Sequence, residues 1–405
     1  MTDVVDAHAP LSPSGAGVWA HCAGSVSLAA QFPEPITDET KEGNAAHWVA
    51  ASILCQWKSE GGRSPLMHSE YLGSADPDGT IVTLEMLEGA EMYCAEIAEK
   101  IEGIERQGIA TVWDRLQVEQ RVYATERIHP DNWGTCDAWL YVPELPALMI
   151  WDFKFGFLDV PAFENMQLLN YYEAIAQGIG LDGLTDQQVC VEMYAIQPRC
   201  FTANGPIKTW FVKGSDLRGH ANQLRTAAHA ATAPNPSTTT GSHCRYCPAR
   251  HVCQAAQKAA MAGVEYIATA VPDVLSGAGV SFEVATLRRA KADIEYRLEA
   301  MEEDAQSRIT AGKTVPGFRV QRTAGRRKWT AEIEVIRNMG AMLGANLIAD
   351  EKAKTPHQAE LELKRKGLAK SAVDTMIAPL TAQPSSGTKL VADDGSEARR
   401  IFSQN

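Results

Sequence analysis

The sequence lacks several features that would place it in a well-known class. No stretch reaches the ~18 consecutive apolar residues that a membrane-spanning helix needs. The opening MTDVVDAHAP has neither the basic nor the apolar part of a signal peptide. The phosphate-binding pattern G-x-x-x-x-G-K-[ST] is missing, so any ATPase or helicase activity would need a separate chain. These absences predict a cytoplasmic protein that is neither a membrane protein nor an ATP-driven motor.

Positive charge is also scarce. The chain has 38 Lys and Arg against 50 Asp and Glu, a formal net charge of −12. Phosphate binding is driven by Lys and Arg that displace counterions, so this balance argues against a broadly basic nucleic-acid-binding surface. It remains compatible with a local basic groove beside metal-binding carboxylates. The 405 residues, 45% hydrophobic and 22% charged, have the composition of a globular protein with more than one domain.

Apolar periodicity predicts an α/β core followed by a helical module. Helical patterns and strand-like runs alternate, which is typical of α/β proteins, in the order helix 42–57, helix 82–106, strands 113–123, 134–142 and 147–155, helix 161–178, strands 189–198 and 207–214. In the first helix, one predicted apolar face consists of Ala46, Val49, Ala50, Ile53 and Leu54. After the last strand, apolar residues at three- and four-residue steps predict one long amphipathic helix over 282–309. We therefore predict a core domain over residues 1–270, the long helix within 271–315, and a basic, helical C-terminal module over 316–405.

Two strand-like runs, GTCDAWLYV and ALMIWDFKF, flank the turn PELP. A symmetric turn would pair Val142 with Ala147 and therefore place Asp137 opposite Asp152. Side chains alternate along a strand, so Lys154 would project from the same face as Asp152. Opposed carboxylates repel each other, and Mg²⁺ or Mn²⁺, which prefer oxygen ligands, would compensate that repulsion. The alternative is a surface hairpin on which these charged side chains are merely solvated.

Three short motifs follow one another along the chain. Gly134-Thr-Cys-Asp137 and Asp152-Phe-Lys154 lie on the hairpin, and Gln167-Leu-Leu-Asn-Tyr171 follows on the next predicted helix. This order and spacing resemble the PD-(D/E)XK nuclease superfamily, in particular its RecB-like branch with a trailing Q-x-x-x-Y. The proline of the superfamily name is absent here, but the RecB-like branch commonly has G-x-x-D at that element. The branch also has an upstream helical histidine, and His47 in EGNAAHW stands in the expected place.

The resemblance implies a restriction-endonuclease-like core with a nuclease site. Asp137, Asp152 and Lys154 would be its catalytic residues. His47, Asp137, Asp152 and the backbone carbonyl of Phe153 would bind Mg²⁺ or Mn²⁺. Such an ion would stabilise charge on a phosphate and lower the pKa of a bound water.

Two further polar residues follow the hairpin at helical spacing. Gln167 and Tyr171 are four residues apart and share a helix face, and the resemblance places them near the DNA. By themselves they are more typical of a half-buried polar patch, as His47 by itself is of a structural histidine. Glu119, in the predicted strand QVEQRVY, could also approach the metal, but nothing in the sequence distinguishes it from an exposed strand glutamate.

Cys244, Cys247 and Cys253 lie within the short stretch HCRYCPARHVC. Three thiols at this density predict a metal site in a protein of the reducing cytoplasm. A local fourth ligand, His243 or His251, would make a tetrahedral zinc site, whereas a distant fourth cysteine would make a cubane iron-sulfur cluster. The spacing alone leaves both open.

Iron-sulfur nucleases of the RecB-like branch, such as Cas4 and AddB, have one cysteine before the nuclease core and three after it. Cys22 stands where the first belongs, so the resemblance implies a 4Fe-4S cluster held by Cys22, Cys244, Cys247 and Cys253. This cluster would staple the N-terminal segment to the region near residue 240. We expect the other cysteines to be buried packing residues: Cys55, Cys94, Cys136, Cys190 and Cys200.

Over nearly its full length, including TPHQAELELKRKGLAK and KLVADDGSEARR, the sequence resembles the DUF2800 family of phage and prophage proteins, which is regarded as RecB-like. The resemblance implies an exonuclease in the bacterial host cell that resects DNA ends for recombination or repair. Its partner would be a phage recombinase or annealing protein. Alternatives are a non-catalytic DNA-binding or scaffold protein that retains the nuclease fold and metal cluster, and a zinc protein of unrelated function.

A basic stretch, VPGFRVQRTAGRRKW, follows the long predicted helix. Its cations are interleaved with Phe318 and Trp329, a combination that can contact phosphates and stack on bases. We therefore predict DNA binding by Arg326, Arg327 and Lys328. The alternative is a solvated hairpin, or one whose cations neutralise the acidic helix face at residues 302–304.

Overall fold

The computed structural model describes residues 9–32, 37–64, 68–183, 185–200, 205–267, 275–324, 328–329, 331–349, 352–353, 370–382 and 385–392, together with the single positions 356, 359, 363, 366 and 368. The chain divides into two compact units, Met1–Arg297 and Leu298–Asn405. Among the described residues, no helix combines the length and apolar character needed to cross a bilayer.

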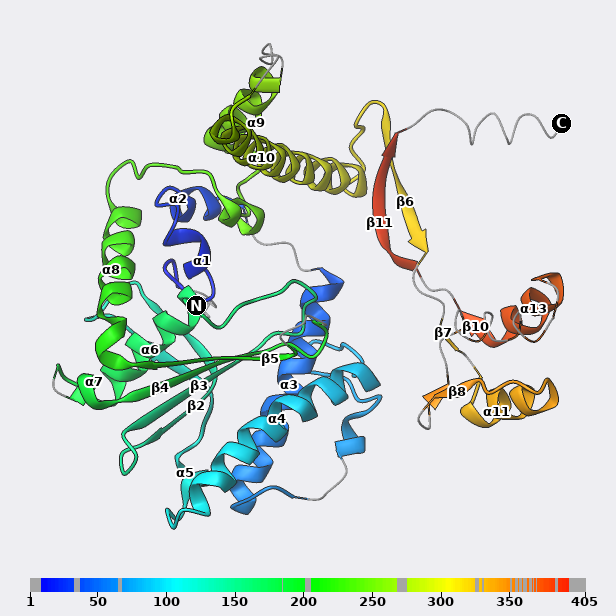
Figure 1. Ribbon diagram of the computed structural model, residues 1–405, viewed down its shortest axis with the longest axis horizontal. Helices are drawn as coiled ribbons and strands as arrows, with labels where there is room; N and C mark the ends of the chain where they lie inside the picture. Colours follow the sequence, from blue (N-terminus) through cyan, green and yellow to red (C-terminus); the bar gives the residue numbers. More distant parts are fainter. Residues whose placement is uncertain are drawn as a thin grey trace, which may run out of the picture. The chain divides into compact units, whose positions relative to one another are not determined.

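A five-stranded mixed sheet forms the centre of the first unit, in the order β1-β2-β3-β4-β5 (Figure 1). Its strands are β1 Gln117–Tyr123, β2 Trp133–Val142, β3 Ala147–Phe153, β4 Cys190–Ile196 and β5 Ile207–Lys213. Neighbouring strands are antiparallel except β3 and β4, which are parallel. Every residue of β3 is buried, because this central strand is covered on both faces. The α/β class is therefore confirmed.

The β2–β3 hairpin has the predicted register. Val142 pairs with Ala147, and Ala138 pairs with Trp151, with residues 143–146 forming the turn. The next position in this register sets Asp137 beside Asp152. The hairpin motif was readable from the sequence because side chains alternate with a period of two, and a one-residue slip would expose the apolar positions.

Helices cover both faces of the sheet (Figure 1). One face packs against α3 Asp38–Glu60, α4 Leu84–Glu105 and α5 Val112–Arg115. The other packs against α1 Ala16–Trp19, α6 Met166–Gly178 and α8 Arg218–Thr232. Two hydrophobic cores thus enclose the sheet, and the predicted buried face of α3 is confirmed at Ala46, Val49, Ala50, Ile53 and Leu54.

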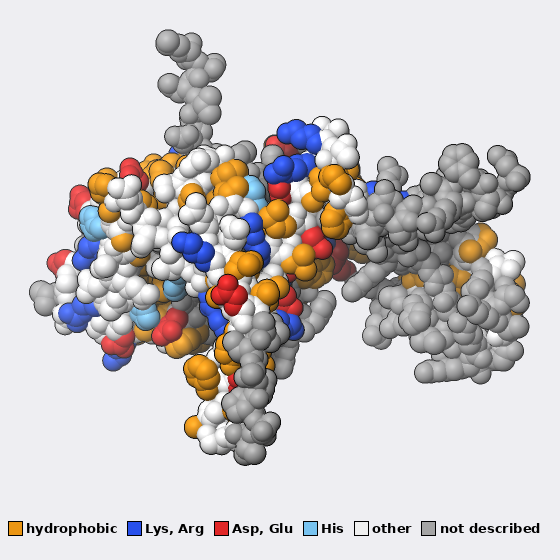
Figure 2. Space-filling view, turned by 90° about the horizontal axis from the view of Figure 1, so that it is seen from above, with side chains coloured by type: hydrophobic (Ala, Val, Ile, Leu, Met, Phe, Trp, Pro, Cys, Tyr) orange, Lys and Arg blue, Asp and Glu red, His pale blue; other side chains and the backbone are white. Residues whose placement is uncertain are grey.

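The first unit also contains further helical elements. They are α2 Ser25–Ala29, η1 His68–Tyr71, α7 Thr185–Gln188, η2 Gly214–Leu217, η3 Ser242–Tyr246, α9 Gln254–Ile267 and the start of α10 Gly277–Thr310. The long predicted helix is confirmed as α10. Surface charges of both signs are interspersed on the face seen in Figure 2.

Two boundaries differ from the prediction. The strand predicted from residue 113 begins only at Gln117, because residues 112–115 form the short helix α5, whose Trp113 enters the core. The helix predicted from residue 161 begins at Met166. Asn165 caps it, since its side chain accepts hydrogen bonds from the backbone N–H groups of residues 167 and 168.

The second unit was predicted to contain a basic and helical module, but the structure has strands there as well as helices. After α10 it contains α11 Ile333–Met342, α13 Lys370–Ile377, η4 Ala378–Leu380 and strands β6 Phe318–Ala324, β7 Lys328–Trp329, β8 Ile348–Ala349, β9 Lys352–Ala353, β10 Thr381–Ala382 and β11 Ser385–Ala392. The strands pair as three two-stranded sheets, β6 with β11, β7 with β10 and β8 with β9. β6 and β11 are distant in sequence, so their pairing has no local signal. A small core around Ile336, Leu347 and Val373 holds α11 and α13.

Candidate metal centres

Three carboxylates share one row across the sheet. The β1–β2 register pairs Val118 with Ala138 and Gln120 with Cys136, which sets Glu119 beside Asp137. The β2–β3 register sets Asp152 on the other side of Asp137. Each strand thus contributes one acidic side chain at the end of the hairpin that is remote from its turn. Such a row is electrostatically unfavourable unless a cation or a proton compensates it.

His47 approaches this row from α3. Its Nδ1 lies 3.6 Å from Oδ1 of Asp137 and 3.8 Å from Oε1 of Glu119. Among the described residues, His47, Glu119 and Asp137 are the one group of three or more potential ligand atoms that all lie within 4.8 Å of one another. Two carboxylates and an imidazole are suitable donors for a divalent metal ion.

Glu119 is the site residue that the sequence did not single out. Its φ is +47°, in the left-handed region that non-glycine residues seldom adopt inside a strand. Its neighbours keep a continuous pairing register with β2, so the departure is confined to this one position. Glu119 could have been predicted as a site residue only from its position opposite Asp137, and that position is known only once β1 is known to pair with β2.

Asp152 and Lys154 lie beside this group, at the end of β3. Asp152 is 1% exposed, and the Lys154 ammonium donates to its Oδ1 at 3.0 Å. Oδ2 of Asp152 is buried and, although the ammonium is equally near, accepts no hydrogen bond from any described residue. The backbone N–H of Phe153 donates to Oδ2 of Asp137 at 2.7 Å, which fixes that carboxylate against β3. Asp152 is not within the 4.8 Å group around His47.

A chain of hydrogen bonds connects Lys154 to α6 and back to β2. Lys154 Nζ donates to Oε1 of Gln167 at 2.9 Å, and Gln167 Nε2 lies 3.3 Å from the Tyr171 hydroxyl. That hydroxyl donates to the Thr135 carbonyl at 2.6 Å. Tyr171 is 3% exposed, so it packs in the core and does not face solvent. Both predicted residues therefore lie at the site, where they hold Lys154 and the strand that carries Asp137.

Burial and close charges shift the pKa of each group in the site. Burial, opposed by Lys154 and reinforced by Asp137, raises the pKa of Asp152 to about 6. Burial also raises the pKa of Asp137, although His47 counteracts it. Burial lowers the pKa of His47 and of Lys154, but nearby carboxylates outweigh it and leave both pKa values above their ordinary range. Buried carboxyls with raised pKa values, one of which has an oxygen that accepts no hydrogen bond from a described residue, fit a site completed by a cation.

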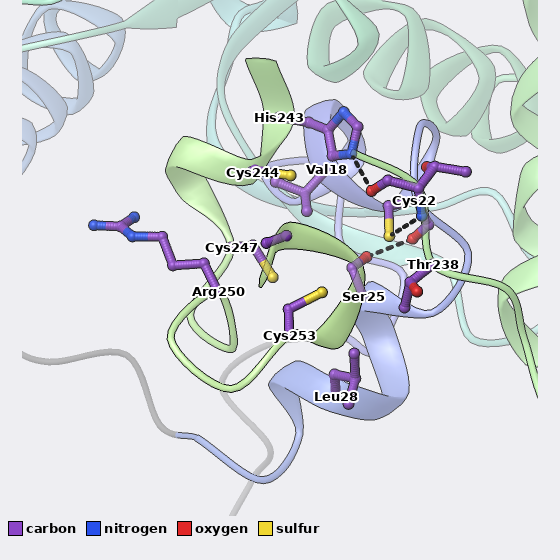
Figure 3. A pocket seen from close by; sticks show the side chains of 12 residues that line it. Val18, Cys22, Ser25, Leu28, Thr238, His243, Cys244, Cys247, Arg250 and Cys253 are labelled. Carbon is purple, nitrogen blue, oxygen red and sulfur yellow. Dashed lines mark hydrogen bonds between the residues drawn. The ribbon is translucent and has the colours of Figure 1, made fainter. Parts of the chain in front are cut away.

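A second centre joins the two ends of the first unit. Cys22, after α1, and Cys244, Cys247 and Cys253, around η3, line one small cavity and turn their sulfur atoms toward a common space (Figure 3). The backbone N–H of Thr239 lies 3.4 Å from the Cys22 sulfur. The four thiols thus come together from segments more than 200 residues apart, as the resemblance to iron-sulfur nucleases implied.

Close backbone contact makes this juncture possible. The N–H of Gly24 donates to the Ser237 carbonyl at 2.8 Å, and a Cβ on residue 24 would lie 2.5 Å from the Thr238 side chain. Only glycine fits at such an approach. The Thr239 hydroxyl also donates to the carbonyl of His21, the residue before Cys22.

Burial and hydrogen bonding shift the pKa values of Cys22, Cys244 and Cys247, but not in the same direction. Hydrogen bonding to the Cys22 and Cys244 sulfurs raises the pKa of His243 to about 10. Burial raises the pKa of both thiols, but the hydrogen bond to His243 and a hydrogen bond from the backbone, of Thr239 to Cys22 and of Gly241 to Cys244, together outweigh it and leave each pKa below its ordinary value. Burial raises the pKa of Cys247 to about 11. A lowered thiol pKa favours the thiolate, which is the form that binds metal.

The distances between the ligand atoms help to distinguish a single zinc ion from a larger cluster. Sulfur atoms around one tetrahedral zinc ion would lie roughly 3.8 Å apart, given Zn–S bonds of about 2.3 Å. Among the described residues, no three of these cysteines and His243 have their ligand atoms within 4.8 Å of one another. Of the two histidines considered as zinc ligands, His243 lines the cavity, whereas Nδ1 of His251 lies 3.1 Å from the Pro248 carbonyl.

The remaining cysteines correct one expectation. Cys94, Cys136 and Cys200 are buried, as predicted, but Cys55 and Cys190 are exposed. Cys55 lies on the outward face of α3, and Cys190 is the first residue of β4.

The predicted DNA-binding cations lie almost entirely outside the described residues. Arg326 and Arg327 are not among them, and of Lys328 only the backbone, which begins β7, is described.

A mixed α/β unit with a histidine–carboxylate group at the end of a hairpin, and four cysteines joined from its two ends, defines a protein with two candidate metal centres. The chain matches the family described as "Protein of unknown function (DUF2800)" over residues 8–397. It therefore belongs to the DUF2800 family, as its sequence had indicated. The match spans both units.

Proposed function

We propose that the protein is a metal-dependent deoxyribonuclease of the PD-(D/E)XK superfamily, in its RecB-like branch, that acts as an exonuclease on DNA ends. The observation that carries the proposal is the meeting of His47, Asp137, Asp152 and Lys154 from separate elements at one end of the β2–β3 hairpin. The five-stranded mixed sheet between helical layers supports a restriction-endonuclease-like fold.

His47, Asp137, Asp152 and the Phe153 carbonyl would hold Mg²⁺ or Mn²⁺, and Glu119 extends this ligand set. Bound there, the cation supplies Lewis acidity toward a phosphate oxygen and lowers the pKa of a water. The carboxylates must lose their protons to bind it, and their raised pKa values mean that this step costs free energy in the metal-free protein.

Lys154 would act as a positioned cation. Its raised pKa keeps the ammonium charged at neutral pH. An ammonium has three donors, of which Asp152 and Gln167 accept two. The third can donate to a phosphate oxygen or to the attacking water, and would stabilise the charge that develops as the phosphodiester bond breaks.

The second centre would hold a 4Fe-4S cluster through Cys22, Cys244, Cys247 and Cys253. The wide spacing of the sulfur atoms supports a cluster over a single zinc ion. Its role would be structural, since it ties α1 and α2 to η3. In a phage setting, single strands released by the nuclease would pass to a recombinase or annealing protein.

Digestion of 5′- and 3′-labelled single- and double-stranded DNA with Mg²⁺ or Mn²⁺ tests the nuclease proposal. Asp152→Asn should abolish cleavage as EDTA does, and Lys154→Ala should lower kcat by about 10²- to 10³-fold, the usual effect of removing one charge-stabilising donor. Asp114→Asn, which changes an exposed carboxylate on α5, is the matched control and should cleave normally.

Cleavage that survives both EDTA and Asp152→Asn would refute the metal site. Tight DNA binding by the wild-type protein without cleavage under any metal would instead support a non-catalytic DNA-binding protein.

A further inference from the structure

The loop between β3 and α6, residues 154–165, exposes aromatic side chains beside the proposed nuclease site. Phe157 is 64% exposed and Phe163 is 62% exposed, and Leu158 between them is also exposed. Phe157 lies beside Arg199, and the ring of Phe163 packs edge-on against Trp210 on β5. Each ring also offers exposed aromatic surface with which another molecule can make contact.

The backbone of this β3–α6 loop is held in place. Gln197, buried at the end of β4, accepts a hydrogen bond from the Val160 N–H and donates one to the Leu158 carbonyl, each at 2.8 Å. Lys208 on β5 donates to the same Gln197 side chain at 2.6 Å and pairs with Asp159. The exposed rings are therefore presented from a fixed backbone, which lowers the entropic cost of binding through them.

Both ends of the loop are part of the proposed site. The loop begins at Lys154 and leads into the first turn of α6, where Gln167 accepts the Lys154 hydrogen bond. Phe157 follows Lys154 by three positions, so their Cα atoms lie within about 11 Å of each other.

Arg199 ties the same loop to the helix that carries His47. Its guanidinium lies 3.9 Å from the ring centroid of Phe155 and 5.0 Å from that of Phe157. It also pairs at 2.7 Å with Glu42, which precedes His47 on α3. The Phe157 ring thus has a cation close by, and the same cation is paired with α3.

We propose that Phe157 and Phe163 stack on unpaired bases, so that the site takes a single-stranded DNA end rather than a blunt duplex. The inference rests on the proposed nuclease function and names its substrate. Every base offers a face to an aromatic ring, so this contact is independent of sequence, whereas the bases of a duplex are already stacked on one another. Of the acidic side chains of the loop, Asp159 is compensated by its ion pair with Lys208.

Binding measured in EDTA separates this inference from catalysis. The full-length double variant Phe157→Ala, Phe163→Ala should bind a fluorescein-labelled oligo(dT) strand at least about 5-fold more weakly for each stacking ring that is removed. Its affinity for a blunt duplex of equal length should be unchanged. The double Leu variant, which keeps apolar bulk without a π face, should bind the strand similarly weakly, and the double Trp variant should restore the affinity.

Phe211→Ala is the matched control, because Phe211 is similarly exposed on β5 but its ring lies against Tyr194 and Lys100 rather than against a residue of the loop. A 2-aminopurine base in the strand should lose fluorescence on binding to the wild type and not on binding to the double Ala variant.

Wild-type affinity for oligo(dT) in the Ala or Leu double variants would overturn the inference, as would failure of the wild-type protein to bind the strand. If the rings prove necessary for strand binding but no DNA is cleaved with Mg²⁺ or Mn²⁺, the nuclease proposal fails while base stacking stands. If DNA is cleaved and the variants bind and cleave single strands normally, the nuclease proposal stands alone.

Discussion

At the residue scale, the row of three carboxylates at the candidate nuclease site can bind a metal ion, but the carboxylates repel one another when no ion is bound. Asp137 lies between Glu119 and Asp152, and His47 and Lys154 compensate only part of the negative charge. Burial, reinforced by the neighbouring carboxylates, raises the pKa values of Asp137 and Asp152, so both take up protons at a higher pH than an exposed carboxyl does. Proton and metal binding must therefore compete at this site.

The first prediction is a pH-dependent stability in EDTA. A carboxyl whose pKa rises from 3.8 unfolded to about 6 folded stabilises the fold at low pH, and that contribution is lost as pH rises through about 6. The loss corresponds to about 3 kcal/mol. His47, also raised in pKa, acts in the same direction. Urea unfolding from pH 4 to 8 should show the decline, and Asp152→Asn should flatten it.

Added Mg²⁺ or Mn²⁺ should reduce this decline, because the ion binds the deprotonated carboxylates and so stabilises the folded state more at higher pH. A metal-free wild-type protein whose stability increased from about pH 4 to 7 would contradict the pKa assignment.

The second prediction concerns the backbone of Glu119. A non-glycine residue with positive φ costs on the order of 1 kcal/mol or more, and Asn tolerates this conformation better than Gln. Glu119→Asn should therefore exceed Glu119→Gln in free energy of unfolding by roughly 1 kcal/mol, although both remove the same charge. Both should bind Mn²⁺ more weakly by calorimetry. Equal stability of the two variants would show that the positive φ carries no strain.

At the element scale, the cysteine centre would add a direct link between the N-terminal helices and the segment around η3. α1 and α2 are helices of only four and five residues, too short to be stable alone. They pack against α8 and η3 and contact the chain near residue 238 through Gly24. A metal cluster at Cys22 would close a loop of more than 200 residues, which in a cross-link model is worth roughly 5 kcal/mol.

The third prediction follows from this closure. Cys22→Ser, Cys244→Ser, Cys247→Ser and Cys253→Ser should each lose iron, bleach the anaerobically purified protein and lower its melting temperature. Cys55→Ser, at an exposed position on α3, should do none of these. Iron content, acid-labile sulfide and the absorbance spectrum should be measured for the wild type and for each variant. If the protein contains zinc instead of iron, with His243 as a ligand, the iron-sulfur assignment is wrong and the centre is a local zinc site.

α6 shows how one helix serves the other centre. Its capped start places Gln167 against Lys154, and four residues later Tyr171 reaches the backbone of β2. A Q-x-x-x-Y pattern therefore acts here as an internal support for Lys154 and for the strand of Asp137.

At the scale of the whole molecule, the family match over both units indicates that they belong together in one protein. The first unit contains both candidate metal centres. The second contains three small sheets, and its basic stretch lies at β6 and β7. Its contribution to DNA binding stays a prediction from the sequence.

The fourth prediction tests that contribution. Replacing Arg326, Arg327 and Lys328 with Ala should weaken DNA binding and flatten its salt dependence by ~0.7 to 0.9 of log-log slope for each phosphate that these side chains neutralise in the wild type. The triple Ala variant at residues 364–366, which removes the same charge from the sequence KRK, is the matched control. Equal salt slopes in the two variants would assign the stretch at 326–328 to packing or to another partner.

The sequence by itself determined the features that depend on short-range periodicity. Alternation with a period of two set the β2–β3 register and so paired Asp137 with Asp152, and helical periodicity set the buried face of α3. Dense spacing within one segment was also enough to identify the three clustered cysteines. These predictions succeeded because each interacting partner lies within a few residues or one turn of the other.

Only the tertiary structure decided the features that depend on which distant segments pair. The place of Glu119 in the acidic row requires the β1–β2 pairing and a positive φ, neither of which has a composition signal. The inward position of Tyr171, the exposure of Cys55 and Cys190, and the β6–β11 ladder likewise depend on neighbours far along the chain. The physical reason is that burial and strand pairing are set by the whole packed core, while local propensity sets only the period with which side chains face it.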